Sequence, residues 1–170
     1  DDLWSKLIAL HSNFMRTCND RELVISSFSF YEELFQCKEL DIKYHDELFK
    51  SLNDLAKYLI PKENAKSVLY GPFGRMIMIV LPTQKDNLNL KKLDQWINII
   101  GYLICEIPSG NFLPPTTHRT LDALVSLLPL PDEFVFKIYV FIVSLACNKI
   151  NNVRLTEVSI DHLQEICKKS

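Results

Sequence analysis

Glycine is scarce in this sequence, with four among its 170 residues. Loops that bind phosphate through backbone amides need glycines at close spacing, and neither Gly-x-x-x-x-Gly-Lys-Ser/Thr nor Gly-x-Gly-x-x-Gly occurs. The stretch Gly71-Pro72-Phe73-Gly74 brings two glycines together, but no lysine follows it and Pro72 has no amide hydrogen to donate. We interpret this stretch as a plain turn. The Gly-x-Ser-x-Gly motif of serine nucleophiles is also absent, so we expect no catalytic residue and no cofactor.

Clusters of metal-binding side chains are absent as well. The five cysteines are widely spaced, without a Cys-x-x-Cys pair. None of the four histidines follows the His-x-x-x-His spacing that places two ligands on one helical face; they are His11, His45, His118 and His162. The sequence therefore predicts no metal site. Unpaired cysteines at apolar positions are typical of a reducing compartment, so we expect an intracellular protein, cytoplasmic or nuclear.

The chain also lacks a basic segment and a long apolar run. Its net charge is −2 and its Lys and Arg residues are scattered, which argues against direct binding of nucleic acid. The longest apolar stretch, Phe134 to Cys147, is interrupted by Lys137 and Ser144. A membrane-spanning helix needs roughly 17 to 25 apolar residues, so we predict no membrane span.

Hydrophobic residues, by contrast, are abundant. They make up 48% of the chain and charged residues 24%, which supplies a large core for a chain of 170 residues. We expect residues 1–170 to form a single helical domain. Because the sequence begins with Asp1 and not with Met, we expect this domain to be a fragment of a larger protein.

Apolar residues recur at helical spacing along most of the chain. The periodicity predicts helices over residues 3–18, 24–37, 44–60, 88–107, 117–128 and 132–149, and a last helix over 160–169 that Ser159 caps. Periodicity leaves residues 65–81 open between a helix and a hairpin. The fold class is therefore all-α, with about seven or eight antiparallel helices in a HEAT-like short stack or a compact irregular bundle. The helix over 132–149 is apolar nearly all round, so we expect it to lie at the centre, buried on all sides.

A weak internal repeat bears on the architecture. Four apolar segments end at Pro61, Pro82, Pro108 and Pro129, and alternate prolines are separated by 47 residues. This period of two helices falls at the edge of the roughly 40 to 47 residues of HEAT and armadillo units. A true repeat would make residues 73–81 helical. The alternative is that helices of ordinary length simply tend to end at proline; the comparison concerns architecture alone, and we identify no family.

These observations favour a non-catalytic protein-protein interaction domain of a scaffold or complex subunit, which binds a partner helix or peptide on a helical surface. The loop from Pro108 to Pro115 carries Phe112 and Leu113, which are candidate partner-binding residues because aromatic anchors dominate interface energies. The alternative is that both side chains fold back into the core. Two other functions stay open. One is a homodimerisation module, and the other is a helical enzyme or small-ligand domain with a dispersed site such as Tyr70, His118 and Arg119.

Overall fold

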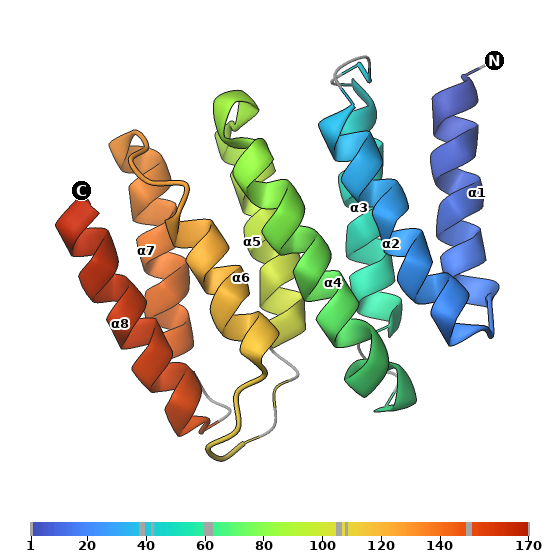
Figure 1. The fold of residues 1–170 in the computed structure, drawn as a ribbon. Coiled ribbons are helices and arrows are strands. Elements are labelled where there is room, and N and C mark those ends of the chain that lie inside the picture. Colours follow the sequence, from blue (N-terminus) through green and yellow to red (C-terminus); the bar gives the residue numbers. More distant parts are fainter. Residues whose placement is uncertain are drawn as a thin grey trace. The chain divides into compact units, whose positions relative to one another are not determined.

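The computed structural model describes residues 2–37, 40–41, 43–59, 63–104, 107, 109–148 and 151–169, with the backbone alone at 58–59 and 63–68. Within these ranges the chain forms eight α-helices, which confirms the all-α prediction (Figure 1). They are α1 (Leu3–Thr17), α2 (Arg21–Gln36), α3 (Lys43–Leu59), α4 (Glu63–Thr83), α5 (Leu90–Ile104), α6 (Pro115–Val125), α7 (Asp132–Ala146) and α8 (Val153–Lys169). In the part of the chain that is described, no helix is long and apolar enough to cross a membrane.

The chain divides into two compact units, and the first comprises Asp1–Val80. In this unit α1 packs against α3, and aromatic side chains join α2 to both α3 and α4. The hydroxyl groups of Tyr31 and Ser51 form a buried hydrogen bond of 2.7 Å between α2 and α3. Burial raises the pKa of the Tyr31 hydroxyl, which therefore stays protonated and available for this bond.

The second unit comprises Leu81–Ser170. In it α5 packs against α6 and α7, while α8 packs against α6 and α7. As a result α5 and α7 lie side by side in one row, and α6 and α8 lie side by side in the other (Figure 1). Such pairing of alternate helices is typical of helical-repeat stacks. The largest side chain of the core between the rows is Trp96 of α5, which is fully buried.

Residues 65–81, which periodicity left open, form part of helix α4. The interpretation of Gly71 to Gly74 as a turn is wrong, because these residues lie inside this helix. Their low helix propensity is outweighed by tertiary packing, since an apolar face of α4 is buried at helical spacing. That face consists of Leu69, Phe73, Met76, Ile77 and Val80. The helical state of 73–81 agrees with the proposed repeat, while the repeat itself stays a prediction.

The last helix starts earlier than predicted. Helix α8 begins at Val153, and the side chain of Asn152 accepts a hydrogen bond of 2.8 Å from the backbone amide of Leu155, as an N-cap does. The prediction that Ser159 caps this helix is wrong, because Ser159 is buried within it and its hydroxyl donates to the Leu155 carbonyl at 2.7 Å.

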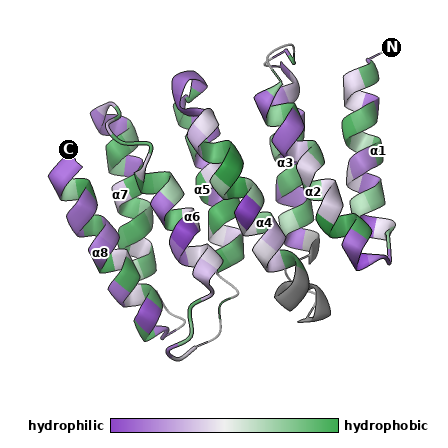
Figure 2. Cartoon of the chain, in the orientation of Figure 1, coloured by the Kyte–Doolittle hydropathy of each residue, from purple (hydrophilic) through white to green (hydrophobic). Residues whose placement is uncertain are grey.

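Helix α7 is apolar along most of its length, as Figure 2 shows in contrast to the mixed colouring of α8. Its predicted burial on all sides is wrong. Its buried residues are Ile138, Ile142 and Leu145, whereas Phe136 and Val140 are 67% and 48% exposed. The physical reason is that α5 and α8 pack against one side of α7 and leave the other side open.

Candidate functional site

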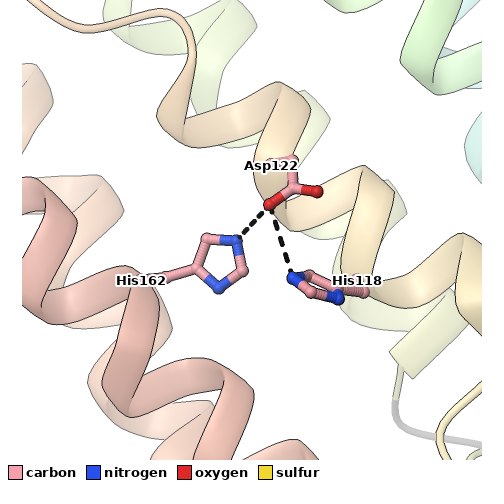
Figure 3. A group of neighbouring side chains, drawn as sticks. All are labelled: His118, Asp122 and His162. Carbon is pink, nitrogen blue, oxygen red and sulfur yellow. Dashed lines mark hydrogen bonds and ion pairs between the residues drawn. The ribbon is translucent and has the colours of Figure 1, made fainter.

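Three polar side chains of the second unit converge on one point between two helices (Figure 3). His118 and Asp122 lie one turn apart on α6, and His162 comes from α8. Atom Nε2 of His162 is 2.8 Å from Oδ1 of Asp122, and Nε2 of His118 is 3.6 Å from the same oxygen. The three potential ligand atoms lie within 4.8 Å of one another, and they form the one such group found among the described residues.

Ordinary helix packing places these side chains. On α6, residues Thr117, Leu121 and Leu124 form the buried face. His118 and Asp122 are four residues apart, so they share one edge of this helix, beside the buried face. On α8, His162 continues the buried face that is formed by Leu155, Val158, Ser159 and Ile166. The packing of α6 against α8 therefore brings a buried histidine to the two residues on the edge of α6.

The hydrogen bonds of His162 fix the position of its protons. Its Nδ1 is 2.7 Å from the Val158 carbonyl oxygen, which only accepts, so Nδ1 carries a hydrogen. In a neutral ring, Nε2 would then present a lone pair to the Asp122 carboxylate oxygen, another acceptor, at 2.8 Å. With this tautomer, Nε2 is the ring atom that faces Asp122 and that could bind a metal ion beside its carboxylate.

The cluster is closed on one side and open on the other. His162 is 2% exposed, whereas the side chains of His118 and Asp122 are 50% and 53% exposed. The imidazole rings of His118 and His162 meet edge to face, with centroids 5.4 Å apart. The cluster therefore borders the solvent through His118 and Asp122.

The loop that carries the predicted partner-binding residues is held against the start of α8. The amide of Val153 donates to the Gly110 carbonyl at 3.0 Å, and the side-chain amide of Asn152 donates to the Phe112 carbonyl at 2.8 Å. Gly110 has a φ of +113°, a conformation that side chains strongly disfavour. Phe112 is 66% exposed, so its predicted alternative place in the core is wrong, and Leu113 is half-buried. Whether the two residues bind a partner stays a prediction.

The open side of α7 forms a second candidate surface, which we call the α7 face: Phe136, Tyr139, Val140 and Val143. The first three are exposed and Val143 is half-buried. On the flank of this face Lys137 forms an ion pair of 2.7 Å with Asp94 of α5, which fixes α7 in its row. Single exposed apolar residues are normal, but a contiguous apolar face is typical of an interaction site.

His11, in the first unit, gives the fold a pH-dependent contact. Its ring stacks on Phe30 at a centroid distance of 3.9 Å, and its Nε2 donates to the Ser27 carbonyl at 3.0 Å. Burial lowers the pKa of His11, whereas its bond to the Ser27 carbonyl opposes this shift. The neutral ring therefore suits the folded state, and the unfolded chain binds the proton more readily.

We expect the wild-type protein to lose more stability between pH 7.5 and pH 5.5 than the His11→Gln variant loses. This part of the stability is complete above the ordinary histidine pKa of about 6.5 and is lost as the pH falls below it. Urea unfolding at both pH values measures the difference. Equal losses for the two proteins would show that the stacked ring is protonated as easily in the folded state as in the unfolded state.

Sequence reasoning missed the cluster because it looked for two histidines or cysteines on one helix. The spacing His118-x-x-x-Asp122 was a usable local signal, but the third member, His162, is 40 residues beyond Asp122 and belongs to another helix. Of the dispersed residues named from the sequence, His118 and Arg119 are exposed on α6, and Tyr70 is half-buried on α4.

Comparisons of the chain with protein-family models, with curated protein sequences and with solved structures found no match. Functional conclusions for this chain therefore depend on its own residues.

Proposed function

We propose that this chain is a non-catalytic protein-interaction domain of an intracellular scaffold or complex subunit, and that its α7 face binds a helix of a partner protein. One observation carries the proposal. Helix α7 is apolar nearly all round, which is the pattern of a helix buried on all sides, yet Phe136 and Val140 remain exposed. Full burial of such a side chain contributes about 1.5–3 kcal/mol, which favours a partner that covers this face.

The spacing of the α7 face supports a helix as the partner. Phe136, Val140 and Val143 follow one another at intervals of four and three residues, the spacing by which one helix packs along another. At the amino end of this face Asp132 and Glu133 are both exposed. We therefore expect a partner helix with an apolar stripe and with basic residues at the end that meets these two carboxylates.

Free thiols support the intracellular part of the proposal. The cysteines of the described residues that carry free thiols are Cys18, Cys37, Cys147 and Cys167, and the last two are exposed. Exposed thiols persist in reducing compartments, which is consistent with a cytoplasmic or nuclear protein.

The test is the double substitution Phe136→Asp with Val140→Asp. Both side chains are exposed, so we expect the variant to fold with an unchanged melting temperature. Because two carboxylates would be buried in the interface, we expect partner affinity to fall by at least roughly 100-fold. The measurement is quantitative affinity purification from cell extract followed by mass spectrometry, and then titration of the partner that the wild-type domain retains.

Leu23→Asp is the matched control, because Leu23 is an exposed apolar residue of α2, 52% exposed compared with 48% for Val140. We expect it to retain the partner. A second comparison is Leu7→Asp with Leu10→Asp, because α1 also exposes a stripe at Leu3, Leu7, Leu10 and Phe14. An identical set of bound proteins for the wild type and the α7 variant would overturn the proposal. If only the α1 variant failed to retain the partner, the interface would lie on α1.

Phe112→Asp tests the loop separately. If Phe112 is part of the same interface, this variant folds normally and also loses the partner, because its side chain is 66% exposed. The homodimerisation alternative is tested by sedimentation. If the wild type has twice the mass of one chain and the α7 variant has the mass of a monomer, the partner helix is α7 of a second copy.

A further inference from the structure

We propose that His118, Asp122 and His162 bind one divalent transition-metal ion, with zinc as the metal that this donor set suits best. Two imidazole nitrogens and one carboxylate oxygen form a ligand set that zinc accepts, with a fourth position for water. The proposal concerns a second site, separate from the α7 face, and is independent of the proposed interaction function.

The ring of His162 is held in the orientation of a metal ligand. Metal-binding histidines almost always donate their other ring N–H to a carbonyl or carboxylate, which fixes the ring and directs the free nitrogen to the metal. His162 makes this contact, since Nδ1 donates to the Val158 carbonyl at 2.7 Å. Because the ring is 2% exposed, its position is held by the surrounding core. Its Nε2 is therefore a preorganised ligand atom.

The three potential ligand atoms lie at separations close to those of a zinc site. A tetrahedral zinc site with bonds of about 2.0–2.1 Å places its ligand atoms about 3.3 Å apart. Here Nε2 of His118 lies 3.6 Å from Oδ1 of Asp122, and Nε2 of His162 lies 2.8 Å from this oxygen. The ligand atoms that the three residues offer all lie within 4.8 Å of one another. Since His118 and Asp122 are half exposed on one helix, small side-chain rotations bring all three atoms to the required separation.

His118 distinguishes a metal site from a plain pair of hydrogen-bonded residues. The contact of 2.8 Å between His162 and Asp122 needs no third residue. Nε2 of His118 lies 3.6 Å from the same carboxylate oxygen, which is longer than a hydrogen bond and within the distance of an ion pair. A metal ion would bind all three side chains. Because His118 is exposed, it can be changed without touching the core.

A bound ion would link two helices. His118 and Asp122 belong to α6, and His162 belongs to α8, so a bound ion would cross-link two helices of the second unit. Such a link stabilises the folded state because the unfolded chain holds no preformed site. Helix α8 also packs against α7, so the ion would fix the helix that supports the α7 face.

The experiment titrates the full chain with zinc chloride after alkylation of its thiols, which removes cysteine as a competing ligand. We expect saturable binding of one zinc ion per chain by calorimetry. We also expect a rise in melting temperature of roughly 5–10 °C at a free zinc concentration 100 times Kd. Cobalt is the spectroscopic probe. Its bound form should show the intense visible absorption of tetrahedral Co²⁺, without thiolate charge-transfer bands.

His118→Ala is the decisive variant, because this exposed side chain has no place in the core. We expect it to fold normally and to weaken zinc binding at least tenfold. Glu157→Gln is the matched control, since it removes an exposed carboxylate of α8 from its ion pair with Arg154 and should leave zinc binding unchanged. The proposal is overturned if the alkylated protein binds no zinc, or if His118→Ala binds zinc as tightly as the wild type. The three residues would then be a hydrogen-bonded pair, His162 and Asp122, with His118 beside it.

Discussion

Replacing Phe73 by alanine is expected to lower the free energy of unfolding of the first unit by about 3–5 kcal/mol, the usual cost of removing a buried phenylalanine. The side chain is 2% exposed, and its ring meets Phe28 of α2 edge to face at a centroid distance of 5.2 Å. Alanine would leave a cavity between α2 and α4 and remove this aromatic contact. Urea unfolding followed by circular dichroism measures the loss.

The control for this prediction is Ile79→Ala. Ile79 lies on the same helix and is 36% exposed, so its truncation should cost less than about 1.5 kcal/mol. Comparing the losses of the two variants separates the effect of the buried Phe73 side chain from the effect of alanine on the helix propensity of α4. A loss below about 1 kcal/mol for Phe73→Ala would contradict the structure and would support the exposed turn that Gly71-Pro72-Phe73-Gly74 suggests in the sequence.

The error at these four residues shows why local preference is a weak guide. Glycine and proline are the poorest helix formers, and Pro72 removes one amide donor from the ladder of α4. The apolar residues before and after them nevertheless keep a helical period, so burying that face stabilises the helix by more than the local cost. Where the period is uninterrupted, as in α5 from Leu90 to Ile104, the sequence predicts the helix directly.

Helix α7 shows a different limit. Its sequence correctly indicates a helix, and its apolar composition predicts burial on all sides. Composition, however, records only which side chains favour burial. The number of neighbouring helices is a property of the tertiary fold, and α5 and α8 cover one side of α7. The exposed Phe136 and Val140 are therefore the point where sequence and structure differ most, and this difference supports the proposed interface.

Two of the three residues of the candidate metal site could be paired from the sequence. His118 and Asp122 share a helix, so their spacing alone places them on one edge. His162 could not be assigned to them from the sequence, because its contact depends on the packing of α6 against α8. The predicted absence of a metal site stays a prediction until zinc binding is measured.

Replacing Asn152 by alanine is the second change with a large expected effect, a loss of about 2–3 kcal/mol in the free energy of unfolding of the second unit. The side chain is fully buried and bonds in two directions. It accepts from the Leu155 amide at 2.8 Å, which caps α8, and it donates to the Phe112 carbonyl at 2.8 Å, which holds the loop. Alanine leaves both groups without this partner. Urea unfolding measures the loss, and faster hydrogen exchange at the Leu155 amide locates it.

Two further variants separate the contribution of the α8 cap to this loss of stability from that of the bond to the loop. Asn152→Ser keeps a side-chain oxygen that can cap α8 but has no amide to donate to the Phe112 carbonyl, so we expect a loss smaller than that of alanine. Phe112→Asp changes only an exposed side chain and keeps the carbonyl, so its stability should stay within about 0.5 kcal/mol of the wild type. If Asn152→Ala were as stable as the wild type, Asn152 would be neither the cap nor the loop's anchor. The Asn152→Ala variant leaves the side chain of Phe112 unchanged. If this variant folds but binds the partner less tightly, the loop must be held in place for Phe112 to act as an anchor.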